Sequence, residues 1–159
     1  MSESDPKLIT PELSPEREKL TELEKTGQYF FHGTNVDVDL LHPRQAMDTV
    51  RGADGDPAVF VSPAADFAIF MAVARHLGHT SSGATFDEHG TYALGFSATQ
   101  DVLDKLKNGA SGWVYVFEKK GFMQHDDSPV EFKSHEPVTP IMKIRVTEHD
   151  LPLISVMTE

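Results

Sequence analysis

The chain has 159 residues and no cysteine, and its 25 acidic and 14 basic side chains give it a formal net charge of −11 at pH 7. A negative field of this size repels phosphate backbones, so we expect no duplex nucleic acid as a partner. No apolar run approaches the ~20 residues of a membrane span, and the first residues lack the basic and apolar stretches of a secretory signal. We therefore expect a cytoplasmic protein that does not bind membranes.

The N-terminal region divides into a tail and a helix. Residues 1–13 are rich in Pro, Ser and Glu, which bury little apolar surface, so we expect a mobile tail. The segment SPEREKLTELEKTG predicts a helix, because Ser14 can cap its start and Gly27 follows its end. Its apolar stripe contains only two leucines, which predicts a surface helix. Residues 14–159 together fit a single domain.

The rest of the chain alternates between extended and helical patterns. In order, we expect a strand at 29–31, a loop at 44–57, a strand at 58–62, a helix at 63–77, a loop at 78–90, a strand at 92–96, a helix at 99–109 and strands at 112–118 and 141–147. The strands are aromatic or β-branched, the helices have apolar residues at helical spacing, and the loops are rich in residues that disfavour regular structure. The pattern predicts an α+β fold with short helices on mostly antiparallel strands.

Three short motifs follow one another in a particular order. They are YFFHGT at 29–34, AVFVSP at 58–63 and VEFKSHEPV at 130–138. In this order they resemble the ADP-ribosyltransferase fold of the diphtheria-toxin and poly(ADP-ribose) polymerase class, whose signature is His, Tyr and Glu. The chain looks closer still to a group of small uncharacterised bacterial proteins related to that fold. The resemblance covers about residues 28–145.

The resemblance implies a split, mostly antiparallel sheet with a cleft that binds NAD as a substrate. A histidine there can hydrogen-bond a ribose hydroxyl, a glycine backbone can hold the nicotinamide amide, and an aromatic ring can stack on the nicotinamide. A carboxylate facing the ribose stabilises the positive charge that develops as the glycosidic bond breaks. The expected cofactor-binding residues are His32, Gly33, Thr34, Phe60 and Phe70, and the expected catalytic residues are His32, Phe60 and Glu131.

Two positions depart from the family pattern and leave other functions open. Phe60 stands where the family has Tyr, which keeps the ring face but loses the hydroxyl, and FAIF at 67–70 lacks the serine of the polymerases. A non-catalytic interaction module that keeps the fold is therefore an alternative. A 2′-phosphotransferase-like enzyme acting on RNA is another, although it needs basic residues to bind phosphates and the net charge opposes it. The sequence does not indicate which acceptor would receive ADP-ribose.

Each candidate also has an ordinary structural role. His32 could be a strand-end histidine bonded to a backbone carbonyl. Phe60 and Phe70 could be core residues, and Glu131 could be a surface carboxylate. The order of the three motifs, rather than any one residue, therefore supports the resemblance.

Two further features are assigned structural roles. Ser62 before Pro63 predicts a helix cap rather than a nucleophile. His76, His79 and His89 lie close together in sequence, but neither a cysteine nor a pair of histidines four apart around a glutamate accompanies them. We therefore expect no metal site.

Overall fold

The computed structural model describes residues 14–48, 52–86, 88, 92–124 and 130–157, with side chains described except in 44–48, 52–57, 86 and 92. The tail expected at residues 1–13 lies outside the described residues. The helices are α1 (Pro15–Lys25), α2 (Ala65–Val73) and α3 (Gln100–Lys107), and the 3₁₀ helices are η2 (Arg75–Leu77) and η3 (Glu148–Asp150). Within the described ranges, no helix has the length and apolar character needed to cross a membrane.

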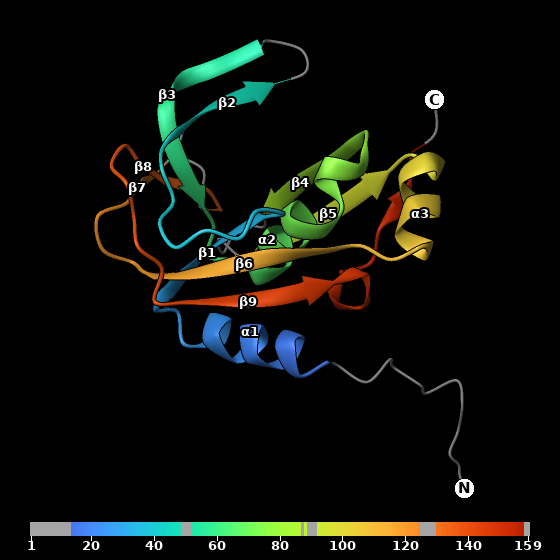
Figure 1. Ribbon diagram of the computed structural model, residues 1–159, viewed down its shortest axis with the longest axis horizontal. Coiled ribbons are helices and arrows are strands. Elements are labelled where there is room, and N and C mark those ends of the chain that lie inside the picture. The colour runs from blue at the N-terminus through green and yellow to red at the C-terminus, as the bar shows by residue number, and fades with distance from the viewer. Residues whose placement is uncertain (1–13, 49–51, 87, 89–91, 125–129, 158–159) are drawn as a thin grey trace, which may run out of the picture.

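The strands pair mostly antiparallel (Figure 1). In chain order they are β1 (Tyr29–Thr34), β2 (Arg44–Asp48), β3 (Gly52–Val61), β4 (Thr80–Phe86), β5 (Tyr92–Ala98), β6 (Ser111–Glu118), β7 (Met123–Gln124), β8 (Phe132–Ser134), β9 (Met142–Thr147) and β10 (Ser155–Val156). Three groups form, ordered β1-β6-β9, β10-β5-β4 and β2-β3-β8-β7, and only the β10–β5 pair is parallel among them. The predicted α+β class with mostly antiparallel strands is confirmed.

Two segments expected to be loops are strands instead. Residues 44–48 and 52–57 of this segment form β2 and the first half of β3, an antiparallel pair with a register shift between Arg44 and Ala46 (Figure 1). Within 78–90, β4 pairs with β5 along its whole length. The loop predictions were wrong because strand formation depends on pairing with a neighbour more than on the composition of the strand itself.

Helix α2 lies directly against the backbones of β1 and β6. A Cβ atom added to Gly33 would lie 1.8 Å from the carbonyl oxygen of Ala68, and one added to Gly112 would lie 2.1 Å from that of Ala72. Neither separation leaves room for a carbon atom. The absence of a side chain at both glycines, and the small alanines opposite, therefore set the distance between helix and sheet.

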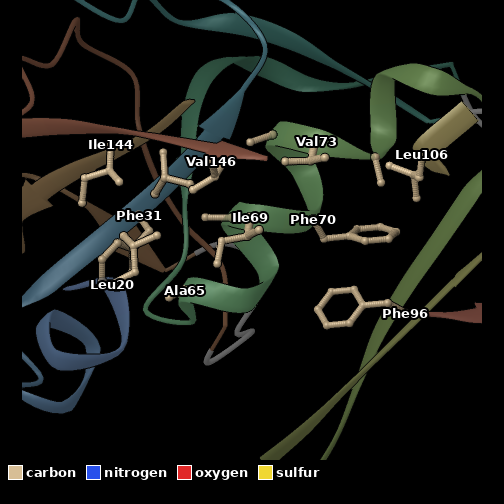
Figure 2. Close-up of a cluster of buried hydrophobic side chains, with 14 of the residues drawn as sticks. Leu20, Phe31, Ala65, Ile69, Phe70, Val73, Phe96, Leu106, Ile144 and Val146 are labelled. Carbon is tan, nitrogen blue, oxygen red and sulfur yellow. The ribbon is translucent and has the colours of Figure 1, made fainter. Parts of the chain in front are cut away.

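The largest core fills the space between α2, the β1-β6-β9 sheet and β5 (Figure 2). Its members include Leu20, Phe31, Ile69, Phe70, Val73, Phe96, Leu106, Ile144 and Val146. A second core occupies the other face of β1 and contains Phe30, Leu41, Val59, Val61, Tyr115 and Phe117. Because successive side chains of a strand point to opposite faces, the neighbouring phenylalanines of β1 enter different cores.

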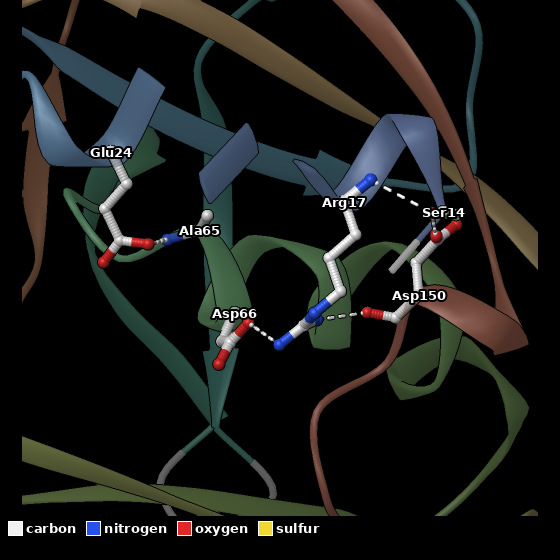
Figure 3. Close-up of polar contacts among 6 residues, drawn as sticks. All are labelled: Ser14, Arg17, Glu24, Ala65, Asp66 and Asp150. Atoms are coloured by element: carbon white, nitrogen blue, oxygen red, sulfur yellow. Dashed lines mark hydrogen bonds and ion pairs between the residues drawn. The ribbon is translucent and has the colours of Figure 1, made fainter. Parts of the chain in front are cut away.

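Polar contacts attach the start of α1 to the rest of the fold (Figure 3). The Ser14 hydroxyl accepts the Arg17 N–H at 3.0 Å, which confirms the predicted cap, and it also hydrogen-bonds the carboxylate of Asp150. The Arg17 guanidinium pairs with Asp66 at 2.8 Å and donates to the Asp150 carbonyl. Together with the fully buried Leu20, these contacts hold the helix along β9.

The N-terminus of α2 is capped from another helix rather than by its own sequence. Its N-cap residue, Ala64, makes no side-chain cap, and the Ser62 hydroxyl instead accepts the Ala64 N–H at 3.0 Å before the helix begins. The predicted Ser62 cap was therefore wrong, because the helix starts later than expected. The Glu24 carboxylate of α1 accepts the Ala65 N–H at 3.4 Å (Figure 3). Burial raises the pKa of Glu24 despite that hydrogen bond.

Replacing Gly112 with Ala should strongly destabilise the fold. The added carbon would overlap the Ala72 carbonyl, and neither backbone can move away without disturbing the core, so we expect the free energy of unfolding to fall by about 3 kcal/mol. Gly83→Ala in β4 is the matched control, because a Cβ there meets nothing within 4 Å. Urea unfolding measures both variants. Equal stability of the two would show that the close approach of α2 is not a constraint.

Glu24→Gln should stabilise the protein at neutral pH. A folded-state pKa above the unfolded value means that the carboxyl contributes stability below pH ~4.5 and loses it as pH rises through the raised pKa. Glutamine keeps the oxygen that accepts the Ala65 N–H and removes the charge. The melting temperature of the variant should exceed that of wild type at pH 7, and the difference should vanish towards pH 4. The control is the exposed Glu22→Gln on the same helix, and a less stable Glu24→Gln variant at pH 7 would contradict the expectation.

Candidate functional site

A cleft of about 1030 Å³ is lined by β1, β3, α2, η2, β4 and the residues that lead into β8. This volume lies at the upper end of the range for small-molecule sites. The six residues singled out from the sequence all line it, namely His32, Gly33, Thr34, Phe60, Phe70 and Glu131. Segments far apart in the chain are therefore gathered around one space.

The strand register brings His32 and Glu131 together. The N–H and C=O groups of Phe31 exchange hydrogen bonds with Ser62 at 2.7 and 2.8 Å, which joins β1 to the end of β3. On the other side of β3, Val61 pairs with Phe132 of β8. Neighbouring strands lie about 4.8 Å apart, so the backbones at His32 and Glu131 are separated by roughly 10 Å. Both residues line the same cleft.

The imidazole of His32 is held in a fixed orientation. Its Nδ1 lies 2.6 Å from the Phe60 carbonyl oxygen, and its ring is nearly parallel to that of Tyr115, with 6.4 Å between centroids. A carbonyl oxygen only accepts, so Nδ1 carries the proton of the neutral ring and Nε2 has the lone pair. The bond to a backbone carbonyl is the structural role that the sequence left open. It also sets the tautomer in which Nε2 can accept a hydrogen bond from a hydroxyl group.

The backbone of Gly33 faces the edge of β1 that lies away from β6. Phe31 directs its N–H and C=O groups to Ser62, and the residue two positions further along a strand directs its groups the same way. In the antiparallel register set by this bridge Gly33 lies opposite Phe60, and both residues line the cleft. Gly33 thus combines a packing requirement, set by Ala68, with a donor and acceptor pair suited to an amide.

The two candidate aromatic rings differ in exposure. Phe60 is half-buried on the cleft wall, where a ligand ring can reach it. Phe70 is only 1% exposed, and its ring packs on Phe96 with 4.7 Å between centroids (Figure 2). The core role that the sequence left open for Phe70 accounts for its position.

Glu131 is held between two anchored neighbours. Val130 before it is 9% exposed, and the ring of Phe132 after it stacks on Phe30 with 4.5 Å between centroids. At the end of β8, the Ser134 hydroxyl donates to the Glu136 carbonyl at 3.0 Å and accepts the Glu136 N–H at 3.1 Å, which closes a tight turn. These contacts position a half-buried carboxylate at the cleft.

A wall of the cleft that is rich in histidine and contains one arginine was not anticipated from the sequence. Four of the eight histidines line the cleft, namely His32, His42, His76 and His79, and Arg75 lies among them. Glu131 is the single carboxylate among the lining residues that the structure describes. Partial burial lowers the pKa of His76, which favours the neutral ring with one N–H donor. The sequence did contain a signal for this wall, because the run RHLGHTSS at 75–82 is basic and rich in hydroxyl groups although the chain as a whole is acidic.

The histidines considered for a metal site can be located only in part. His89, one of the three histidines considered for a metal, lies outside the described residues, and the described part of the chain has no group of three or more His, Asp or Glu side chains placed to hold a metal ion.

Comparison with protein-family models, curated proteins and solved structures finds no match to this chain. The basis for a functional proposal is therefore the cleft together with the resemblance of the three motifs.

The neutral ring of His32 should carry its proton on Nδ1. The acceptor-only Phe60 carbonyl at 2.6 Å requires a donor at that nitrogen. Long-range ¹H–¹⁵N correlation spectra above the imidazole pKa report the tautomer, and the His32→Gln variant identifies the signals that belong to His32. A predominant Nε2–H form would contradict the described orientation.

Proposed function

We propose that the protein binds NAD in this cleft, cleaves the nicotinamide–ribose bond and transfers ADP-ribose to an acceptor. The observation that supports this most is the meeting of His32, Phe60 and Glu131 on adjacent segments of one cleft. These positions match, in order, the His, Tyr and Glu of the class that the sequence resembles. The proposal rests on fold-level analogy together with this geometry.

The reaction divides into bond cleavage and capture. The electron pair of the glycosidic bond moves to the pyridinium nitrogen, which releases neutral nicotinamide and leaves positive charge on the ribose. The acceptor then forms a bond to C1′ and loses a proton, so the products are nicotinamide, the ADP-ribosylated acceptor and a proton. In this proposal the Glu131 carboxylate stabilises the positive ribose. His32 accepts a ribose hydroxyl through Nε2 in both the ground state and the transition state.

The missing tyrosine hydroxyl changes how the substrate would be held. Phe60 offers a ring face for stacking but no polar group. Orientation of the amide would therefore depend on the N–H and C=O groups of Gly33, and orientation of the ribose on His32 and Glu131. The non-catalytic interaction module remains the alternative if these contacts are insufficient for turnover.

Calorimetric titration of the full chain with NAD, nicotinamide and ADP-ribose tests binding directly. We expect heat with NAD and with nicotinamide, because the proposed contacts include the amide and the ring. Neither heat nor a thermal shift at millimolar concentrations of all three compounds would overturn the proposal and favour the interaction module.

Glu131→Gln should separate catalysis from binding. Glutamine keeps the size and hydrogen-bonding capacity of the side chain but removes the charge that acts only as the ribose becomes positive. We expect NAD affinity within a few-fold of wild type and a fall in nicotinamide release of roughly 10² to 10³. His32→Ala should instead weaken binding itself.

The control for this experiment is Glu136→Gln, an exposed glutamate five residues along the same segment and outside the cleft lining. It should release nicotinamide at the wild-type rate. A Glu131→Gln enzyme that also keeps the wild-type rate would remove Glu131 from the reaction.

A further inference from the structure

We propose that Arg75, His76 and His79 form a phosphate-binding subsite in the same cleft, suited to the diphosphate of a nucleotide such as ADP-ribose. The identity of the nucleotide rests on the proposed function, whereas the subsite itself rests on charge, backbone anchoring and position. All three side chains line the cleft and are solvent-exposed.

The first support is the local charge. The chain carries 25 Asp and Glu residues, yet Glu131 is the single carboxylate among the described lining residues, and it lies next to β8 rather than beside η2. Arg75 is the single Arg or Lys of that same set. A guanidinium in an acid-poor cleft of an acidic protein is placed for an anionic ligand, since Arg binds phosphate through two parallel N–H donors.

The second support is the way the segment 75–79 is anchored from behind. The Leu77 carbonyl accepts the Lys105 ammonium at 2.9 Å, and the His79 carbonyl accepts the Thr99 N–H at 3.2 Å. Between them, a Cβ added to Gly78 would lie 2.9 Å from the Val102 side chain of α3, so the backbone at Gly78 packs closely against that helix. Since α3 and its cap hold the backbone, the guanidinium and imidazoles extend from a fixed base.

The third support is that no carboxylate of the described residues neutralises Arg75. Arg17, by contrast, pairs with Asp66 at 2.8 Å. The Asp101 carboxylate would lie 3.8 Å from a Cβ on Gly78, and it pairs with Lys105 at 3.2 Å. Its charge is thereby offset on the α3 side of the segment.

The neighbouring strand adds neutral donors. Thr80, Ser81 and Ser82 at the start of β4 also line the cleft, directly after His79. Hydroxyl and imidazole N–H groups complement the guanidinium, because a diphosphate presents more acceptor oxygens than one Arg can satisfy. The subsite therefore combines one fixed positive charge with several neutral donors.

The position of the subsite selects a long ligand. Helix α2 has nine residues and a length of about 13 Å, and it connects the Ser62 end of the cleft, beside Glu131, with the Arg75 end. A ligand that contacts both ends must be longer than a mononucleoside. A dinucleotide with its nicotinamide near His32 extends its diphosphate towards η2.

Arg75→Gln tests the subsite in the full chain by calorimetric titration with ADP-ribose, inorganic pyrophosphate and nicotinamide. We expect the affinity for ADP-ribose and pyrophosphate to fall at least about 10-fold, the cost of a lost charge-assisted hydrogen bond, while nicotinamide affinity stays within two-fold. His79→Asn should weaken both phosphate ligands several-fold. The exposed Arg145→Gln of β9, outside the cleft lining, is the matched control and should bind all three like wild type.

The outcomes distinguish this inference from the proposed function. If nicotinamide binds and ADP-ribose affinity is the same in Arg75→Gln and wild type, the subsite is refuted and the proposed function stands. If ADP-ribose and pyrophosphate bind in an Arg75-dependent way but NAD is never cleaved, the subsite stands and the proposed function fails. Absence of pyrophosphate and ADP-ribose binding at millimolar concentration would also refute the subsite, as would an equal loss in Arg145→Gln.

Discussion

The direct contact of α2 with two strand backbones is the constraint on which the cleft depends. Gly33 and Gly112 admit the Ala68 and Ala72 turns of the helix at distances that no side chain would permit. Because α2 is fixed, its start lies next to the bridge between β1 and the end of β3. The 3₁₀ helix η2, which follows the end of α2, then lines the opposite end of the cleft. One packing contact therefore positions the proposed catalytic end and the proposed phosphate end together, because interiors packed at this density do not adjust locally.

Elements whose signals are local could be predicted from the sequence, and those that depend on a distant partner could not. Ser14 caps α1 and Gly27 follows its end with a φ of 70°, a conformation that glycine adopts at low cost. By contrast, β4 contains Thr, Ser and Gly, and its strand conformation comes from pairing with β5. Residues 44–57 were misjudged for the same reason, since their Gly, Asp and Pro content indicates turns when considered alone.

The candidate site also has features that could be predicted from local motifs and features that depend on distant partners. The order of three motifs was sufficient to single out His32, Phe60 and Glu131, which the structure gathers around one cleft. The pairings that bring them together, through Phe31 and Ser62 on one side of β3 and its neighbour β8 on the other, have no signature in a single sequence. Nor could the histidine-rich wall with Arg75 be predicted, because a single sequence does not show which carboxylates the fold places in the cleft lining.

The net charge of −11 and the acid-poor cleft select between ligands of different size. Charges separated by more than about 8 Å are largely screened at physiological salt, so a diphosphate in the cleft would respond to Arg75 and the nearby N–H groups rather than to the whole chain. A duplex or a long RNA must place its other phosphates against the acidic exterior, where each one is repelled. The same composition that argues against a polyanionic partner is therefore compatible with a dinucleotide, and it disfavours the 2′-phosphotransferase alternative more than the proposed transferase.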